Sequence, residues 1–300
     1  MPEGDSPTIA RRRVRLALRE ARELATLTQL QVAEEMEWSL SKVIRIENGD
    51  VSIAPNDLRP LLGLLNIKDK AVVADLVADA RIARTRQRRA WFQTPEFREH
   101  LTPALMRLIE YEAEAAAIRS YTLLFLPGPL QVIEYSRALL ENYEDDITED
   151  QRRLRLEARQ LRRQTLMSRL GSVEIYVLLE ESVLWRPIGG MAAFAAQLRE
   201  LRKLASDGLI HIRMIPFTSD IPVTNNAMYD LLSLGDDAAG SEVLYRETGL
   251  QDELIEDRAT TGRHHERYMK LWNRAASEED TIAFIGGRIE ELEANTNRPQ

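Results

Sequence analysis

The stretch WSLSKVIRIENGD, residues 38–50, places hydrogen-bonding and cationic side chains close together. Helical spacing puts Ser41, Lys42 and Arg45 on one side of a short helix. A guanidinium such as that of Arg45 can form a bidentate contact with guanine, and the Ser41 hydroxyl can donate or accept a hydrogen bond. Lys42 supplies a positive charge suited to a phosphate or a guanine. These residue types could therefore contact a nucleic acid.

The same segment carries one apolar pair more than a small helix needs. Ser39 is a good helix N-cap and Gly49 a good terminator, so we expect a helix over 39–47. Leu40 and Ile44 lie four residues apart and cannot form hydrogen bonds, but they could pack on thymine methyl groups. The alternative is that they pack against a neighbouring loop of the protein and contact no base.

Two further helices must position this segment. Residues 11–25 show the apolar spacing of a helix, and Thr28 with Gln31 forms a capping box that opens a second helix. A tight break at Glu37 and Trp38 then precedes the third helix. This spacing predicts a helix-turn-helix, and the alternative is a three-helix bundle without a DNA role. The predicted interior residues are Val32, Ala33, Met36, Val43 and Ile46.

Residues 28–49, TQLQVAEEMEWSLSKVIRIENG, strongly resemble the Cro/repressor family of helix-turn-helix regulators, also called XRE. One departure is Thr26, where that family commonly has Gly. The resemblance implies that Gln29 and Asn48 contact phosphates at the two ends of the motif. It implies that Leu40, Ser41 and Arg45 face base edges, and that Lys42 contacts the DNA backbone or a guanine. Ile44 is included in the reading surface on physical grounds. Glu47 would form a structural ion pair with Arg22.

Composition favours a chain of two domains without disulfides. The chain has 300 residues, no cysteine and a net charge of −8. Residues 1–90 carry 16 Lys and Arg against 13 Asp and Glu, a net charge of +3, which leaves −11 for the remainder. The predicted domains are a DNA-binding domain over 11–70, a helical connector over 71–100 and a third region over 101–295. No signal peptide and no membrane helix are expected, so the predicted location is cytoplasmic, with association to the nucleoid when DNA is bound.

The region after residue 100 alternates between predicted helices and strands. Helices are expected over 105–119, 130–143, 148–170, 190–206, 256–275 and 278–294. Strands are expected in the segments SYTLLF, VEIYVLLE, LIHIRMIP, AMYDLLSL and EVLYRET. We therefore predict an α+β fold, in which an all-α helix-turn-helix domain precedes a mixed α/β C-terminal domain.

The C-terminal region has no enzyme signature that the sequence can test. The serine hydrolase, zinc protease, Walker and dinucleotide-binding patterns are all missing, so no catalytic residue, metal or cofactor is predicted. Trp185 and Arg186 combine an aromatic ring and a guanidinium next to two glycines. They are a candidate loop for a partner or ligand, and the alternative is an ordinary turn between a strand and a helix.

A second resemblance covers this region. Residues 112–140, 177–190, 213–217 and 243–248 resemble the C-terminal domain of the actinobacterial WhiJ-like regulators. Pro129 and Val132 depart from that family's usual loop sequence. The resemblance implies an antitoxin-like regulator, often paired with a small partner protein encoded nearby.

These observations together predict a sequence-specific DNA-binding transcriptional regulator. A repressor is the expectation, and activation is the alternative that the sequence leaves open. We expect a homodimer that binds a double-stranded DNA operator, with a C-terminal domain that binds a small partner protein or ligand and contributes to dimerisation. The alternative is a protein-interaction module, an antitoxin whose main role is to neutralise a small partner protein. In that case DNA binding is secondary.

Overall fold

The computed structural model describes residues 6–85, 90–141, 147–220, 228–235, 242–247 and 252–296. The chain divides into two compact units, residues 1–90 and residues 91–300. The first unit is entirely helical in its described part, and the second contains a six-stranded mixed sheet with helices. The predicted α+β fold class is therefore confirmed. No helix among the described residues is long and apolar enough to cross a membrane.

Five helices form the described part of the first unit, and their ends follow from local capping. They are α1 (Pro7–Leu24), α2 (Gln29–Glu35), α3 (Leu40–Asn48), α4 (Pro55–Leu64) and α5 (Lys70–Ile82). Thr28, Ser39 and Asp69 cap α2, α3 and α5 with side-chain oxygens that accept backbone N–H bonds. Pro55 occupies the first turn of α4, where its missing N–H costs nothing. Pro60 lies inside α4 without ending it.

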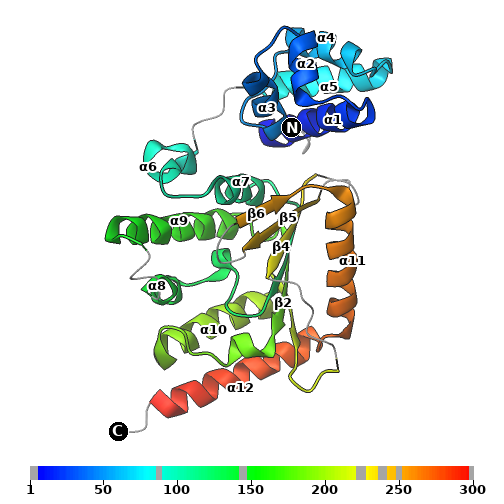
Figure 1. The fold of residues 1–300 in the computed structure, drawn as a ribbon. Helices are drawn as coiled ribbons and strands as arrows, with labels where there is room; N and C mark the ends of the chain where they lie inside the picture. The colour runs from blue at the N-terminus through cyan, green and yellow to red at the C-terminus, as the bar shows by residue number, and fades with distance from the viewer. Residues whose placement is uncertain are drawn as a thin grey trace. The chain divides into compact units, whose positions relative to one another are not determined.

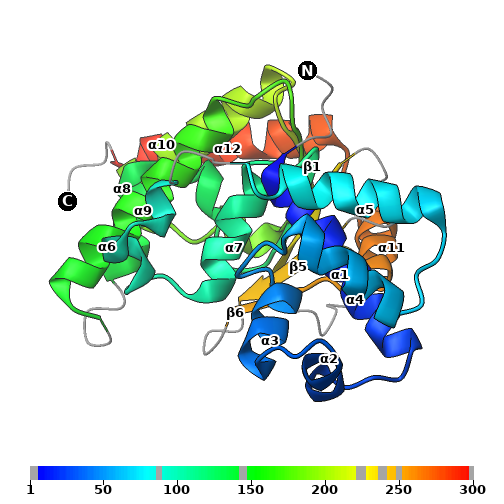
Figure 2. The same ribbon diagram turned by 90° about the horizontal axis from the view of Figure 1, so that it is seen from above.

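The helix α5 belongs to this unit and is not part of a connector. Leu76, Val77 and Ala80 of α5 are buried in the same core as Leu18 of α1 and Leu58 of α4. Figure 2 shows α5 lying along α1. The predicted connector over 71–100 is therefore wrong in its first part, because α5 supplies one wall of the N-terminal core.

The second unit is built around one sheet with strand order β3-β2-β1-β4-β5-β6. The strands β1, β2 and β3 are parallel, and β4, β5 and β6 join them in antiparallel pairs. The strands are β1 (Ala117–Thr122), β2 (Glu174–Glu180), β3 (His211–Ile215), β4 (Tyr229–Ser233), β5 (Glu242–Glu247) and β6 (Asp252–Ile255). The centre of the sheet is apolar, as the fully buried Val177, Leu178 and Leu231 show.

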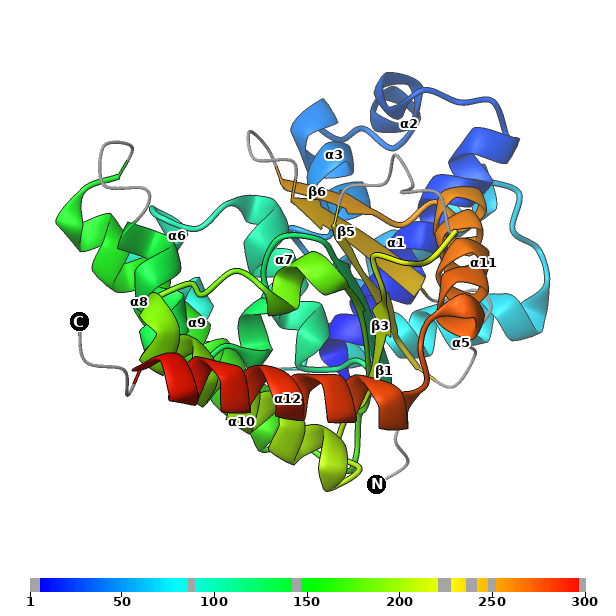
Figure 3. The same ribbon diagram turned by 90° about the horizontal axis from the view of Figure 1, so that it is seen from below.

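Helices cover both faces of this sheet. The larger helices are α7 (Pro103–Glu112), α8 (Ile133–Glu141), α9 (Glu149–Met167), α10 (Gly190–Ser206), α11 (Arg258–Arg274) and α12 (Glu278–Thr296). The short ones are η1 (Trp91–Gln93), α6 (Pro95–Arg98), η2 (Gly128–Leu130) and η3 (Glu181–Leu184). Figures 1 and 3 show α11 on one face and α7 to α10 on the other, with α12 alongside α10. Tyr268, Leu271 and Trp272 of α11 pack on the first face.

Two segments differ from the sequence prediction. The helix expected over 105–119 ends at Glu112, and Ala117 begins β1 despite the alanine-rich sequence. Pairing with β2 and β4 on both sides overrides the local helix propensity there. The strand β6 was not predicted, because its sequence DELI has little β character and it pairs only with β5.

Candidate nucleic-acid interface

The turn between α2 and α3 fixes the angle at which α3 leaves the core. Glu37 has a left-handed backbone with φ +54°. The Trp38 N–H donates to the Ala33 carbonyl oxygen at 2.8 Å, which closes the end of α2. Val32 and Ala33 of α2 are buried. A small residue at position 33 lets the two helices approach closely.

One side of α3 is buried and the other is open. Val43 and Ile46 are each 4% exposed and lie in the core, as predicted. Ser41, Arg45 and Asn48 are exposed. No hydrogen bond or ion pair engages the side chain of Arg45 or Ser41 within the described residues.

The two extra apolar residues of α3 differ in exposure. Leu40 is 39% exposed, and Ile44 is half-buried. Gly49 then ends the helix with φ +80°, and a Cβ there would lie 2.8 Å from the Arg15 Cδ atom. Gly49 therefore ends the helix after Asn48. The exposed side of the helix carries Ser41 and Arg45 beside Leu40.

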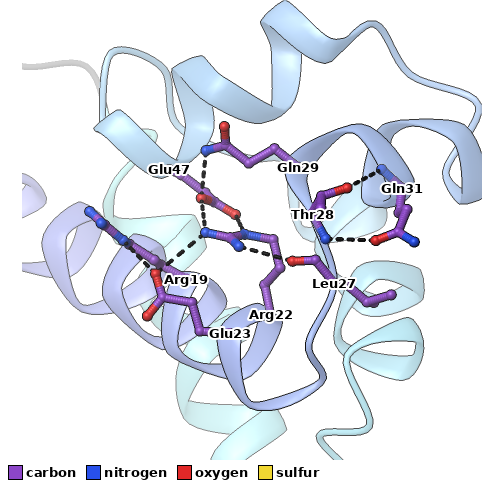
Figure 4. A network of polar contacts seen from close by, with 8 residues as sticks. All are labelled: Arg19, Arg22, Glu23, Leu27, Thr28, Gln29, Gln31 and Glu47. Atoms are coloured by element: carbon purple, nitrogen blue, oxygen red, sulfur yellow. Dashed lines mark hydrogen bonds and ion pairs between the residues drawn. The ribbon is translucent and has the colours of Figure 1, made fainter.

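A buried carboxylate holds the motif together, as Figure 4 shows. The structure contains the ion pair between Arg22 and Glu47, with Nε to Oε1 at 2.6 Å and Nη2 to Oε2 at 3.0 Å. The Arg22 Nη1 atom also donates to the Leu27 carbonyl oxygen at 3.0 Å. The hydrogen bond to Glu47 raises the pKa of Arg22. Because both side chains are largely buried, this pair is structural and is not a DNA contact.

Two predicted DNA contacts have partners within the chain. The Gln29 Nε2 atom donates to Glu47 Oε2 at 2.8 Å. The Lys42 ammonium lies 2.8 Å from Asp57 Oδ2 and 3.6 Å from the centre of the Trp38 ring. The Lys42 pair is partly exposed, so it is weak and can exchange for a phosphate. The sequence did not indicate either partner. Glu47 was assigned to Arg22 alone, and Asp57 lies on another helix, α4.

The Trp185 and Arg186 loop lies at the carboxyl ends of the parallel strands. The Trp185 Nε1 atom donates to Glu181 Oε1 at 2.8 Å, and the Arg288 guanidinium carbon lies 3.8 Å from the centre of the ring. Trp185 remains 44% exposed. Glu181 also accepts a hydrogen bond from the Phe217 N–H at 2.7 Å, which brings a second exposed aromatic residue to this edge.

Comparison with known families divides the chain at similar places. Residues 14–76 match a model described as a helix-turn-helix domain. Residues 105–287, more than half of the chain, match a model described as a domain of unknown function, DUF5753. The chain belongs to the DUF5753 family. Its first unit is a helix-turn-helix domain, which supports DNA binding. No curated protein and no solved structure matches the chain.

The DUF5753 domain also contains polar residues that sequence reasoning missed. Arg155, Arg159 and Arg162 of α9 line a cavity together with Asp230 of β4. The arginine spacing of four and then three residues was a readable signal of one helix face. The carboxylate was not readable, since its strand is far away in the sequence. No cluster of metal-binding side chains occurs among the described residues.

Proposed function

We propose that the protein is a sequence-specific DNA-binding transcriptional regulator of the Cro/repressor type that places α3 in the major groove. The observation that carries this proposal is the division of α3. Val43 and Ile46 anchor one side in the core, while Ser41 and Arg45 stand exposed on the other. The N-terminal residues of such a helix reach base edges in the major groove. In this proposal the protein is not an enzyme and acts in the cytoplasm, on the nucleoid.

The charge distribution supports sequence-specific binding. Residues 1–90 carry a net charge of +3 and the remainder −11. The basic contribution to DNA affinity is independent of sequence, and an acidic body weakens it. Contacts to bases must therefore supply a larger share of the free energy of binding. A homodimer that reads two half-sites would double those contacts.

The test uses the full chain and DNA fragments recovered by genome-wide pull-down, with the upstream region of its own gene as the first candidate. A double variant with Ser41→Ala and Arg45→Ala should bind its operator about 10–100-fold more weakly, because a bidentate contact to guanine contributes about 1–3 kcal/mol. Arg19→Ala is the matched control, since Arg19 is an exposed helical arginine paired with Glu23. If the folded double variant binds as tightly as wild type, α3 does not read the operator.

A second function is favoured by the apolar edge of the DUF5753 domain. Trp185 and Phe217 are 44% and 66% exposed. Leu124 is 50% exposed and lies in the neighbouring loop, where the Ser182 hydroxyl donates to the Leu123 carbonyl oxygen. Exposed aromatic residues at one edge are typical of protein interfaces. The alternative function is therefore an antitoxin-like module of the WhiJ-like type that neutralises a small partner protein encoded nearby.

The two functions are separated by one pair of variants. In native extracts, tagged wild-type protein should retain a small partner in fixed stoichiometry, and Phe217→Ser with Trp185→Ser should lose it. The Arg45 variant should keep the partner and lose DNA. If partner loss abolishes the biological effect while operator binding is intact, the interaction module is the main function. If no partner is retained, this alternative is excluded.

A further inference from the structure

The DUF5753 domain encloses a cavity of about 290 Å³ between α9 and the sheet. Its lining includes Ser120 of β1, Asp230 of β4 and Tyr245 of β5. Side chains alternate between the faces of a strand, and the neighbours of Asp230, Tyr229 and Leu231, pack with α11. The cavity therefore opens on the opposite face of the sheet from α11. Its volume is near the lower end of the range for small-molecule sites.

Three arginines form one wall of the cavity. Arg155, Arg159 and Arg162 recur along one face of α9. The Arg162 Nε and Nη2 atoms donate to Oε2 and Oε1 of Glu112 at 2.9 and 2.7 Å, so this carboxylate balances the charge of Arg162. Arg159 donates to the Ser136 carbonyl oxygen at 3.3 Å. Arg155 has no hydrogen bond or ion pair in the part of the chain that the structure describes. Arg155 is therefore the arginine of this wall whose guanidinium is available to another acceptor.

The sheet side of the cavity carries carboxylates. The Ser120 hydroxyl donates to Asp230 Oδ1 at 2.5 Å, and Asp230 Oδ2 makes no hydrogen bond to any described residue. Burial raises the pKa of Asp230 to about 6, and the charge of Glu112 acts in the same direction. Glu247 of β5 lies within the field of all three arginines, and partial desolvation at the cavity wall, together with the charge of Asp252, raises its pKa. Asp252 accepts a hydrogen bond from Thr102 at 2.5 Å.

These charges determine which ligand can enter. Among the described residues, the lining contains three guanidinium groups, of which that of Arg162 is paired with Glu112, and three carboxyl groups, those of Asp230, Glu247 and Asp252. A purely anionic ligand would meet the carboxylates, and a purely cationic ligand would meet the arginines. Burying a net charge without a partner is costly, so a ligand that carries both charges fits best. The Tyr245 hydroxyl, which has no hydrogen bond within the described residues, offers one further polar contact.

We propose that this cavity binds a small zwitterion of the size of an amino acid or a dipeptide. The carboxylate of the ligand is bound by Arg155 and Arg159, and its ammonium group by Asp230 and Glu247. The proposal deepens the proposed function, because its regulatory meaning rests on the DNA-binding role. Occupancy of the cavity would be the signal that the regulator senses, whereas the binding event itself does not depend on DNA.

The binding test uses the full chain and a panel of the proteinogenic amino acids and their glycyl dipeptides, read by thermal shift and then by calorimetry. At least one member should bind. For that member, the N-acetyl form retains only the negative charge and the amide form only the positive charge. Each should bind at least about 10-fold more weakly, since a charge-assisted contact is lost. The proposal is overturned if no member binds at about 10 mM, or if a singly charged form binds as tightly as its parent.

Two variants locate the site. Arg155→Gln should weaken binding of that zwitterion at least about 10-fold, and Asp230→Asn should do the same from the opposite wall. Arg199→Gln is the matched control, because Arg199 is an exposed helical arginine that pairs with Glu293 outside the cavity. Unchanged affinity in both cavity variants, with unfolding midpoints at or above wild type, would overturn the proposal. Operator affinity without ligand should be equal in Arg155→Gln and wild type, so a failure here leaves the DNA-binding proposal intact.

Discussion

The carboxylate of Glu47 holds three helices together through Arg22 of α1 and Gln29 of α2. Its side chain is 6% exposed, so removing it leaves the largely buried Arg22 charge with only the exposed Glu23 carboxylate, 3.5 Å away, as an ionic partner. We expect Glu47→Ala to lower the free energy of unfolding by about 3 kcal/mol. Operator affinity should fall with it, because α3 loses its anchor. Urea unfolding measures the first effect and fluorescence anisotropy the second.

The control for Glu47 is another acidic residue in an ion pair. Asp57 pairs with Lys42, and both side chains are partly exposed. Asp57→Ala should therefore lower the free energy of unfolding by less than about 1 kcal/mol. Equal losses in the two variants would contradict the structural role assigned to Glu47.

Thr26 stores backbone strain at the end of α1. Its φ of +56° is unusual for a β-branched residue, and the Cro/repressor regulators that the sequence resembles commonly have Gly there. The left-handed conformation costs about 1–2 kcal/mol, of which Gly recovers part, since it loses more chain entropy on folding. Thr26→Gly should raise the free energy of unfolding by about 0.5–1 kcal/mol. Thr26→Ala keeps the Cβ atom and should give no such gain; a gain of the same size in Ala would point away from strain.

Asp230 makes stability depend on pH. Because burial raises its pKa to about 6, the folded protein holds this proton at pH values where the unfolded chain has released it. The stabilisation from Asp230 is therefore present at low pH and is lost as pH rises from about 4 to about 6. Asp230→Asn should be more stable than wild type at neutral pH, and this advantage should shrink near pH 4. A difference that stays constant in urea unfolding at both pH values would contradict the assignment. Arg162, Glu112 and Glu247 face the same group and are unchanged in the comparison.

At the scale of elements, α3 presents an apolar residue where hydrogen-bonding residues are usual. Leu40 is exposed at the start of the helix, and Ile44 is half-buried one turn later. Thymine methyl groups are the apolar feature of the major groove. Operator half-sites should therefore place thymines beside Leu40, and replacing those thymines with uracil should weaken binding by up to about 10-fold. The same substitution outside the half-sites is the control. Equal affinity for thymine and uracil operators would leave Ser41 and Arg45 as the readers, with Leu40 and Ile44 packed on protein.

The elements that the sequence predicts well are those whose signals are local. Ser39, Thr28 and Gly49 mark helix ends by their own chemistry, and the structure has caps at all three. The start of β1 at Ala117 was misread, because strand pairing decides it and the alanines favour a helix. The helix α5 was misread as a connector, since only the folded core shows what Leu76 packs against.

The candidate sites follow the same rule. The outward side of α3 could be predicted from helical spacing, because one short segment carries it. The partner of Lys42 could not, since Asp57 reaches it from α4. The cavity could not be predicted from the sequence at all. Arg155 and Asp230 come from elements far apart in the sequence, and only the sheet topology brings them together.

At the scale of the whole molecule, a single α3 can contact only a few base pairs, so the proposed function calls for two copies. In the proposed homodimer, two reading helices bind half-sites about one helical turn, ~34 Å, apart. Inserting about 5 base pairs between the half-sites rotates one of them to the far side of the DNA and should abolish tight binding. Inserting about 10 base pairs returns both half-sites to the same face of the DNA but doubles the distance between them. Binding should therefore recover only if the two DNA-binding domains of the dimer can move further apart.

Anisotropy titrations on the three operators test this prediction, and mass photometry counts the chains on each. Two chains on the natural operator and one on the 5-base-pair insertion are expected. If one chain binds all three operators equally well, the protein reads a single half-site as a monomer. The net charge of −11 on the residues after 90 would then be important for specificity, because it suppresses the nonspecific affinity against which one half-site must compete.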